Sequence, residues 1–239
     1  MKKRIDVLML DQKIVSSRND AQKLISEGRV KVNGELVLKN HTKIDESVNI
    51  IVDSDGFFVA RSGAKLQKAI NEFNINVNDF VCLDVGASTG GFTECLLNNG
   101  CKKVYSVDVG SNQLDEKLKK DKRVVNLEKT DIRNLDKLEE LVDLIAVDVS
   151  FISVLKILSY LKKFLKDNGK IVLLIKPQYE ILGDKNKKGK VKDKNLIDGI
   201  LKNVKKEIEK EGYAFLGLVE SPIVGKKGKN VEFLMYLGV

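Results

Sequence analysis

The chain has 239 residues, 43% of them hydrophobic and 32% charged, and its 42 Lys and Arg against 34 Asp and Glu give a net charge of +8. This composition excludes a disordered polymer, and 18 glycines with only two prolines exclude a collagen-like or proline-rich chain. The length suffices for one large core, or for a standard domain plus a small one. No apolar run approaches the roughly 18 to 20 residues of a membrane span, and the N-terminus does not fit a signal peptide. We therefore expect a cytoplasmic protein that does not contact a membrane.

Few residues in the chain are suited to metal binding or nucleophilic catalysis. Cys82, Cys95 and Cys101 lack the C-x-x-C spacing of zinc and redox sites, and we expect them to be reduced and structural. His41 is the single histidine, which removes Ser-His-Asp and Cys-His catalysis and disfavours a bound metal. The sequence gives no indication of the oligomeric state.

Positive charge is concentrated in two zones of the chain. Residues 1–44 carry ten Lys and Arg against five Asp and Glu, and Gly183–Lys194 carries six lysines against two aspartates. Because clustered basic side chains attract polyanions, these zones favour a nucleic-acid partner. Charge alone raises that expectation only modestly.

Two short helices are predicted at the start of the chain. Apolar residues recur at helical spacing from Lys2 to Asp11, and after a break Ser16 or Ser17 can cap a second helix. Gly28 is suited to end this second helix in a left-handed conformation.

A small sheet is predicted to follow these helices. Asn33 and Gly34 lie between alternating apolar positions, which is the strongest short-range signal for a hairpin. Residues 39–51 complete this sheet. The first fifty residues therefore predict a small α+β unit.

Several residues of this unit match a known pattern together: Ser17, Arg18, Ala21, Leu24, Ile25, Gly28, Val30, Val32, Asn33 and Gly34. The pattern resembles the S4 RNA-binding domain over roughly residues 2 to 53. The resemblance implies that the second helix and the hairpin bind structured RNA through phosphate contacts. The alternative is an ordinary solvated face. The basic residues that we expect to contact RNA are Arg4, Arg18, Lys23, Arg29, Lys31 and Arg61.

The rest of the chain alternates short apolar runs with helical stretches. This alternation predicts buried parallel strands in a doubly wound α/β sheet, and residues 154–165 are predicted to be helical. A further helix in this part of the chain, residues 196–211, carries an apolar stripe that we interpret as core packing rather than membrane contact. We expect an S4 domain at residues 1–55, a connector at 56–62 and the α/β domain at 63–239. The predicted strands are Val81–Val85, Val104–Val107, Val124–Leu127, Leu144–Val147 and Ile171–Ile175.

Small and acidic residues follow three of these strands, where α/β proteins bind ligands. A glycine-rich turn follows the first strand, Asp108 follows the second as a ribose-binding acid, and Asp131 with Ile132 suits an adenine ring. The G-x-G-x-x-G and P-loop patterns are absent, which disfavours NAD and ATP. Together these features indicate an S-adenosylmethionine pocket, although each acid alone could be a helix cap. The expected cofactor-binding residues are Asp84, Gly86, Ala87, Ser88, Thr89, Gly90, Gly91, Asp108, Val109, Asp131, Ile132 and Asp148.

Four charged residues bear on the chemistry: Lys65, Asp148, Lys176 and Glu232. Asp148 and Lys176 directly follow apolar strands, a position that costs desolvation unless the two charges pair. Such a pair is either catalytic or a structural ion pair.

Taken together, these segments resemble the FtsJ-type ribose 2′-O-methyltransferases with their Lys-Asp-Lys-Glu tetrad. They resemble more closely the TlyA (haemolysin-A-type) rRNA methyltransferases, in which an S4 domain precedes that catalytic domain. The resemblance implies a Rossmann-like enzyme that uses S-adenosylmethionine to methylate a cytidine 2′-hydroxyl in large-subunit rRNA, with small-subunit rRNA left open. It also implies that Lys176 is the general base, that Lys65 holds the hydroxyl or a neighbouring phosphate, and that Asp148 and Glu232 orient the lysine ammonium.

Two details depart from the family pattern. Ala60 occupies a position where Ser is common, which affects little because Lys65 stays in register, and Lys226–Lys229 is unusually basic and suited to RNA contact. Two other functions stay open as alternatives. One is a non-catalytic RNA-binding or ribosome-assembly factor, and the other, less favoured, is a haemolysin.

Overall fold

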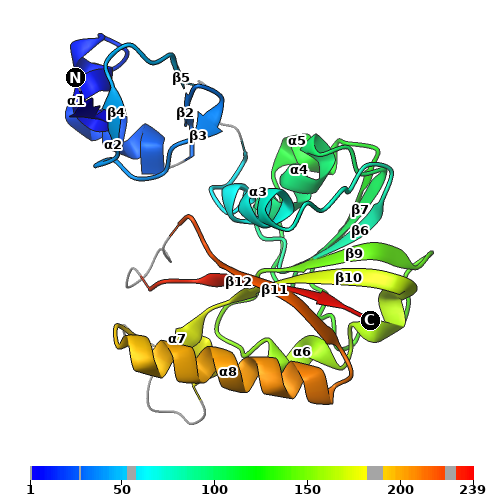
Figure 1. Cartoon of the computed structure of the whole chain (residues 1–239). Helices are drawn as coiled ribbons and strands as arrows, with labels where there is room; N and C mark the ends of the chain where they lie inside the picture. Colours follow the sequence, from blue (N-terminus) through cyan, green and yellow to red (C-terminus); the bar gives the residue numbers. More distant parts are fainter. Residues whose placement is uncertain (1, 27, 53–57, 182–190, 224–229) are drawn as a thin grey trace.

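The structure is a computed structural model, and it describes residues 2–26, 28–52, 58–181, 191–223 and 230–239. Figure 1 shows a small N-terminal unit beside a larger α/β unit, with helix α3 (Gly63–Glu72) on the side of the α/β unit that is nearer to the small one. None of the helices in these described ranges is both long and apolar enough to span a membrane.

The N-terminal unit confirms the predicted caps and the predicted hairpin. The Ser17 hydroxyl accepts a hydrogen bond from the Asp20 amide at 3.1 Å, and Gly28 has φ +71°. Asn33 and Gly34 both have positive φ, as a type I′ turn requires. The helices of this unit are α1 (Ile5–Asp11) and α2 (Arg18–Ser26), and its strands are β1 (Lys2–Arg4), β2 (Val30–Val32), β3 (Glu35–Leu36), β4 (Lys43–Asp45) and β5 (Ile50–Val52).

One part of the N-terminal prediction was wrong. Lys2–Arg4 is not the first turn of a helix but strand β1, which pairs antiparallel with β4 as a separate two-stranded sheet. The buried helical stripe begins only at Ile5, so the three basic residues before it gain nothing from a helix and instead pair their backbone groups with β4. Strands β3, β2 and β5 form the small three-stranded sheet.

The α/β unit contains one seven-stranded sheet in the order β11-β12-β10-β9-β6-β7-β8. The five strands from β10 to β8 run parallel, which confirms the doubly wound prediction, and β12 is antiparallel to both of its neighbours. Strands β11 and β12 were not predicted. The strands are β6 (Val81–Val85), β7 (Lys103–Val107), β8 (Val124–Leu127), β9 (Val142–Val147), β10 (Leu165–Ile175), β11 (Ala214–Glu220) and β12 (Phe233–Gly238).

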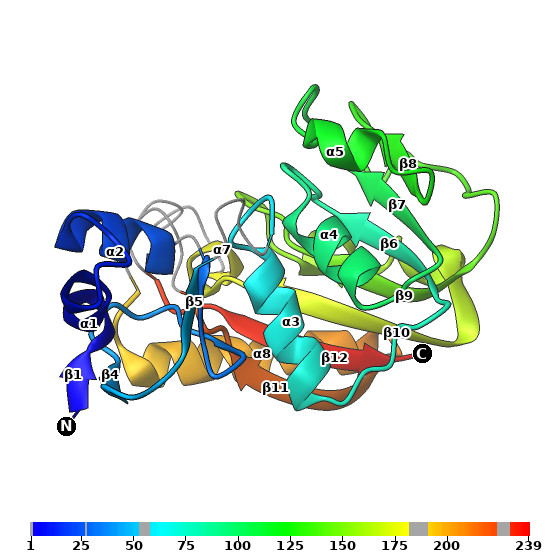
Figure 2. The ribbon, with the colours of Figure 1, turned by 90° about the horizontal axis from the view of Figure 1, so that it is seen from above.

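Helices cover both faces of this sheet. In Figure 2, α3 and α4 lie over one face and α8 lies behind the other. Successive residues of a strand serve opposite cores: Leu144 packs toward α3 and α4, whereas Ile145 packs toward α8. Phe58 and Val59, which we had placed in the connector, pack against the α3 and α4 core. The remaining helices of the unit are α4 (Gly91–Asn98), α5 (Glu116–Lys119), α6 (Leu155–Leu158), α7 (Pro177–Glu180) and α8 (Lys194–Lys210).

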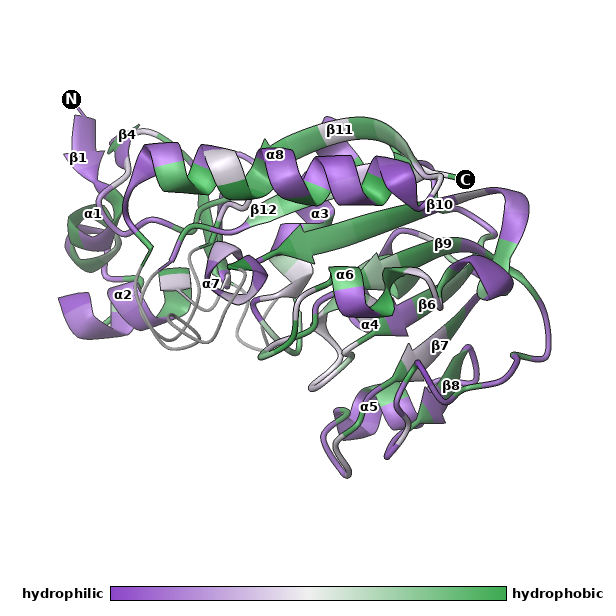
Figure 3. Cartoon of the chain, turned by 90° about the horizontal axis from the view of Figure 1, so that it is seen from below, coloured by the Kyte–Doolittle hydropathy of each residue, from purple (hydrophilic) through white to green (hydrophobic). Residues whose placement is uncertain are grey.

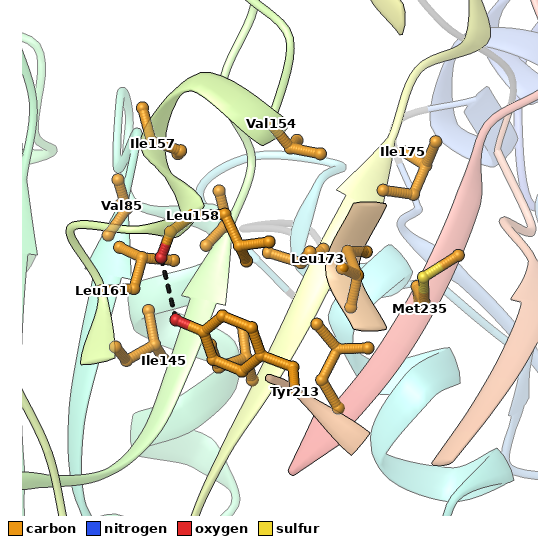
Figure 4. Packing of buried hydrophobic residues seen from close by; sticks show 14 of the residues in the cluster. Val85, Ile145, Val154, Ile157, Leu158, Leu161, Leu173, Ile175, Tyr213 and Met235 are labelled. Atoms are coloured by element: carbon orange, nitrogen blue, oxygen red, sulfur yellow. Dashed lines mark hydrogen bonds between the residues drawn. The ribbon is translucent and has the colours of Figure 1, made fainter. Parts of the chain in front are cut away.

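The α8 core confirms one interpretation and corrects another. The outward face of α8 is largely hydrophilic (Figure 3), while its apolar stripe, Ile197 to Ile208, is buried against the sheet. Figure 4 shows this core, where the Tyr213 hydroxyl donates a 2.8 Å hydrogen bond to the Leu158 carbonyl. Residues 154–165 do not form one helix. They form α6, a turn and a 3₁₀ segment (Lys162–Phe164), because the chain must turn to enter β10.

Candidate active site

Four charged side chains from four elements meet at the carboxyl ends of the central strands. Lys65 lies on α3, Asp148 follows β9, Lys176 follows β10 and Glu232 precedes β12. Lys65 Nζ is 2.6 Å from Glu232 Oε2 and 4.0 Å from Asp148 Oδ2, and Lys176 Nζ is 2.6 Å from Asp148 Oδ1. The four residues therefore form a continuous series of alternating charge, which we call the tetrad.

The tetrad is buried and formally neutral. Lys65, Lys176 and Glu232 are 7%, 6% and 3% exposed, so each charge has lost most of its water. Pairing two cations with two anions offsets that desolvation, and removing one member of a buried pair costs about 3–5 kcal/mol. The predicted ion pair between Asp148 and Lys176 is confirmed. Lys65 and Glu232 continue the series, so the arrangement contains two more charges than a single structural ion pair needs.

Lys176 has two further hydrogen-bond partners. Its Nζ donates to the Val149 carbonyl and to the Ser150 hydroxyl, each at 2.8 Å. With the Asp148 carboxylate, these partners engage all three N–H bonds of a lysine ammonium. The ammonium is therefore held in one position at the end of β10.

A cavity of about 390 Å³ opens onto the tetrad. All four tetrad residues line it, so charged and hydrogen-bonding groups converge on one concave surface. The other residues that line it are Ala60, Arg61, Ser62, Gly86, Ala87, Ser88, Thr89, Phe92, Ser150, Phe151, Gln178 and Tyr179.

A second cavity of about 530 Å³ adjoins the first, and Asp148, Ser150 and Phe151 line both. Its walls combine apolar side chains with carboxylates after β7 and β8. A ligand in this second cavity can therefore present one end to Asp148 and the tetrad. The lining includes seven of the predicted cofactor-binding residues, Gly86, Ser88, Asp108, Val109, Asp131, Ile132 and Asp148, while Ala87 and Thr89 line the first cavity.

The second cavity fits an adenosyl group. Backbone amides of Ser88 and Gly110 donate to the two Asp108 carboxylate oxygens at 2.8 and 2.7 Å, which fixes that acid where ribose hydroxyls can donate to its remaining lone pairs. Hydrogen bonds from Arg133 lower the pKa of Asp131, and its contact with an adenine ring stays a prediction. Ile132 supplies an apolar surface for an aromatic ring.

Three predicted cofactor-binding residues, Asp84, Gly90 and Gly91, line neither cavity. Gly90 has φ +99°, and a Cβ there would lie 2.2 Å from a Leu118 methyl carbon. A Cβ on Gly91 would lie 2.1 Å from the Ser62 hydroxyl oxygen. These two glycines allow close packing behind the turn. Contact of the three residues with a cofactor stays a prediction.

Asp84 is fully buried beneath the glycine turn. Its Oδ2 accepts a 2.7 Å hydrogen bond from the Thr93 hydroxyl, and its Oδ1 has no partner. Burial raises the pKa of Asp84 to about 7, against the opposing effect of the Thr93 hydrogen bond. The carboxyl is therefore protonated over most of the acidic range.

Several residues of the site were missed by the sequence analysis. Phe151 is 69% exposed with φ +67°, and its ring centroid is 5.4 Å from that of Tyr179. Glu180 accepts hydrogen bonds from the Ser153 hydroxyl and the Val154 amide, which attaches α7 to the loop after β9. An aromatic residue three positions after a strand-end acid was the available signal for Phe151.

The predicted RNA-binding residues lie in two places. Arg4 and Arg18 both donate to the Asp6 carboxylate, at 2.9 and 3.1 Å for the closest pairs, and keep side chains that are 41% and 49% exposed. Lys23 is exposed on α2, and Arg29 and Lys31 are half-buried in the same unit. Arg61 lines the first cavity instead. RNA contact by all six stays a prediction.

Some predicted features lie outside the described residues. These are Lys226–Lys229, most of the lysine-rich segment Gly183–Lys194, and the start of the connector.

Comparison with known proteins identifies two families along the chain. Residues 58–239 match the FtsJ-like methyltransferases, and residues 3–50 match the S4 domain. These two matches cover both structural units. They agree with the resemblance found from the motifs.

Three curated relatives are similar over nearly the whole chain. A hemolysin A of Brachyspira hyodysenteriae is 43% identical over 237 residues, 98% of each chain. A 16S/23S rRNA (cytidine-2′-O)-methyltransferase TlyA of Mycobacterium tuberculosis is 36% identical over 239 residues, 98% of this chain and 89% of the relative. A 23S rRNA (cytidine-2′-O)-methyltransferase TlyA of Campylobacter jejuni is 36% identical over 241 residues, 92% of this chain and 93% of the relative.

Proposed function

The chain belongs to the family of FtsJ-like methyltransferases and carries an S4 domain ahead of its catalytic domain, and we propose that it methylates the 2′-hydroxyl of cytidine in ribosomal RNA with S-adenosylmethionine as cofactor. The observation that carries this proposal is the junction of the two cavities. A buried tetrad faces the first cavity, the second cavity fits an adenosyl group, and Asp148 borders both.

The bound cofactor supplies a methyl carbon on a positively charged sulfur. Lys176 takes the proton of the attacking hydroxyl, and Lys65, held by Glu232 at 2.6 Å, donates to that hydroxyl or to an adjacent phosphate. Asp148 contacts both lysines and keeps them in place. Because these groups are fixed before substrate arrives, positioning accounts for much of the expected rate enhancement.

The target nucleotide follows from the named relatives. Both TlyA relatives act, by their names, on a cytidine 2′-hydroxyl of 23S rRNA, and one also acts on 16S rRNA. We therefore propose large-subunit rRNA as the main target and keep small-subunit rRNA as a second one. The S4 unit, residues 1–55, would bind rRNA, and residues 63–239 would carry out the transfer in the cytoplasm.

The exposed aromatic pair suits a nucleobase at the site. Phe151 borders both cavities, and Tyr179 lies beside it at the rim of the first. Aromatic side chains at such a rim stack on unpaired bases. We propose that the target base rests on this pair while its ribose faces the tetrad.

The test is methyl transfer from labelled S-adenosylmethionine to purified large and small ribosomal subunits, followed by nuclease digestion and mass spectrometry. We expect label on a 2′-O-methylated cytidine of the large subunit. Lys65→Ala and Lys176→Met should lower the rate by about 10² to 10⁴-fold. Lys68→Ala is the matched control, since Lys68 lies on the same helix but pairs with Glu72 at its exposed surface.

Three other outcomes would contradict the proposal. RNA binding without transfer to either subunit would favour a ribosome-assembly factor. Label on a base rather than on a sugar would exclude the ribose as substrate. Dye leakage from liposomes, unchanged in the Lys176→Met protein, would favour a haemolysin.

A further inference from the structure

The hydrogen bonding around Lys176 raises a problem for its role as a base. Its nitrogen is tetrahedral, with one bond to Cε and three N–H bonds directed at Asp148 Oδ1, the Val149 carbonyl and the Ser150 hydroxyl, at 2.6, 2.8 and 2.8 Å. An ammonium in this arrangement has no lone pair. Lys176 must therefore lose one proton before it can accept another from a substrate hydroxyl.

Loss of that proton leaves a lone pair that points toward one of the three partners. An ionised carboxylate and a backbone carbonyl can only accept hydrogen bonds, so a lone pair aimed at either oxygen is repelled. A serine hydroxyl can both accept and donate, and its hydrogen rotates freely about the Cβ–Oγ bond. Among these three partners, only Ser150 can donate a hydrogen bond to that lone pair, whereas Asp148 and Val149 can still accept the two remaining N–H bonds.

We infer that Ser150 is a positioning residue for the general base, whose hydroxyl accepts an N–H from charged Lys176 and turns to donate its O–H to the neutral amine. This inference rests on the proposed function. Ser150 also lines both cavities, so the lone pair is directed toward their junction. A ribose hydroxyl at that junction replaces Ser150 as the donor to the amine.

The methyl transfer moves one proton and one electron pair. The 2′-hydroxyl proton moves to Lys176 Nζ as the hydroxyl oxygen forms its bond to the methyl carbon. The electron pair of the broken carbon–sulfur bond stays on sulfur, which becomes a neutral thioether. Lys176 ends as an ammonium with Ser150 again as acceptor, and it releases one proton to water before the next turnover.

The other groups near Lys176 are unchanged by substitution of Ser150. Asp148 faces it from the end of β9, Lys65 from α3, and Glu232 from the start of β12. Tyr179 lies on α7, where burial raises the pKa of its hydroxyl, so that it stays protonated through the neutral range. A changed methylation rate in a Ser150 variant therefore reports the missing hydroxyl.

The experiment compares Ser150→Ala with Ser150→Thr, which keeps a hydroxyl. We measure single-turnover methylation of large ribosomal subunits at increasing S-adenosylmethionine concentration. Ser150→Ala should lower the maximal rate about tenfold, which corresponds to one hydrogen bond to the lone pair, while the cofactor concentration that gives half of that rate stays the same. Ser150→Thr should restore the rate.

Ser153→Ala is the matched control. Its hydroxyl lies in the same loop but contacts Glu180 rather than Lys176, so its substitution should lower the rate less than Ser150→Ala does. An equal loss of rate in Ser153→Ala, or no loss in Ser150→Ala, would overturn the inference.

A second readout does not depend on activity. In protein with ¹³C-labelled lysine, and with neither RNA nor cofactor present, the Lys176 side chain should be more mobile in Ser150→Ala than in the unsubstituted protein, because it has lost one of the three hydrogen bonds that hold its Nζ. Equal mobility, measured from the relaxation of the Cε resonance, would overturn the role of Ser150 even if methylation is confirmed. Increased mobility in a protein that transfers no methyl group would support that role and contradict the proposed function instead.

Discussion

Two aspartates, one in each unit of the molecule, have no exposed surface but very different surroundings. Asp6 of the S4 unit accepts hydrogen bonds from Arg4, Arg18 and Gln22 at 2.9–3.1 Å. Asp84 beneath the glycine turn accepts one from Thr93, and its Oδ1 has no partner. They also differ in depth, because Asp84 lies deep within the α/β unit whereas Asp6 lies just beneath the surface of the small N-terminal unit.

Depth and hydrogen-bond partners together decide the charge of each carboxyl. Burial pushes the pKa of Asp6 up, but hydrogen bonds from Arg4, Gln22 and Arg18 outweigh burial and hold that pKa well below its usual range. Burial dominates at Asp84 and raises its pKa to about 7. A charged Asp6 orients two arginines, whereas Asp84, beneath the glycine turn, is neutral for much of the pH range.

The largest expected effect is a loss of stability of the α/β unit with rising pH. The folded-state pKa of Asp84 lies above its ordinary value of 3.8, so its contribution to stability is full below pH 3.8 and is lost as the pH rises through about 7. The total amounts to about 4 kcal/mol. Only about 2–3 kcal/mol of this total is lost between pH 5 and pH 8, because the carboxyl of the unfolded chain is already ionised at pH 5. Urea unfolding at these two pH values should show that loss, and Asp84→Asn should remove most of it.

If the free energy of unfolding changed with pH in the same way in the unsubstituted and Asp84→Asn proteins, the raised pKa would not belong to Asp84. Cys82→Ser is a poor control because Cys82 is also fully buried, in strand β6 beside Asp84. Asp79→Asn is better, since Asp79 is exposed to solvent before β6.

Substitution of Asp6 should instead lower the stability of the S4 unit at neutral pH. Asp6→Ala removes the charged acceptor of two guanidinium groups, and we expect the S4 unit to lose about 2–3 kcal/mol of stability. Amide hydrogen exchange should increase in residues 2–52 and stay unchanged in α4 and β6. Asp11→Ala, which affects an exposed pair with Lys3, should have little effect. An equal loss in both variants would show that Asp6 has no special role.

Acid should destabilise the S4 unit before the α/β unit. The lowered pKa of Asp6 makes its contribution full above its ordinary value of 3.8, and that contribution is lost as the pH falls below 3.8 toward the folded-state value. Asp84 is protonated throughout this range and contributes no such loss. Hydrogen exchange between pH 5 and pH 2.5 should show the S4 amides opening first, and simultaneous opening of both units would contradict the comparison.

The smallest expected effect is on the affinity for RNA. Arg18→Gln should lower the affinity for large-subunit rRNA and reduce the slope of log affinity against log salt by about one, as for the loss of one phosphate contact. Arg61→Gln should instead change the methylation rate more than the affinity, because Arg61 lines the cavity at the tetrad. Filter binding at several salt concentrations checks both. Identical slopes for Arg18→Gln and the unsubstituted protein would argue against phosphate contact.

The sequence indicated the parallel strands because their residues are apolar on both faces, and it indicated the tetrad because charged residues at strand ends are costly without partners. It did not indicate β11 and β12. Their pairing is antiparallel and non-local, and the exposed and half-buried residues of β11 alternate without a strong apolar run. Ser150 was missed because a serine after a strand is common, and only the position of Lys176 Nζ gives it a role.

The order of strands in the sheet has a consequence for biosynthesis. Strand β12 is made after β11 but lies between β11 and β10, and Glu232 follows its partner Lys65 by 167 positions. A nascent chain that has emerged as far as β11 has neither the partner strand of β11 nor the anion that holds Lys65. The tetrad is therefore complete only after the segment that holds Glu232 and β12 has been synthesised.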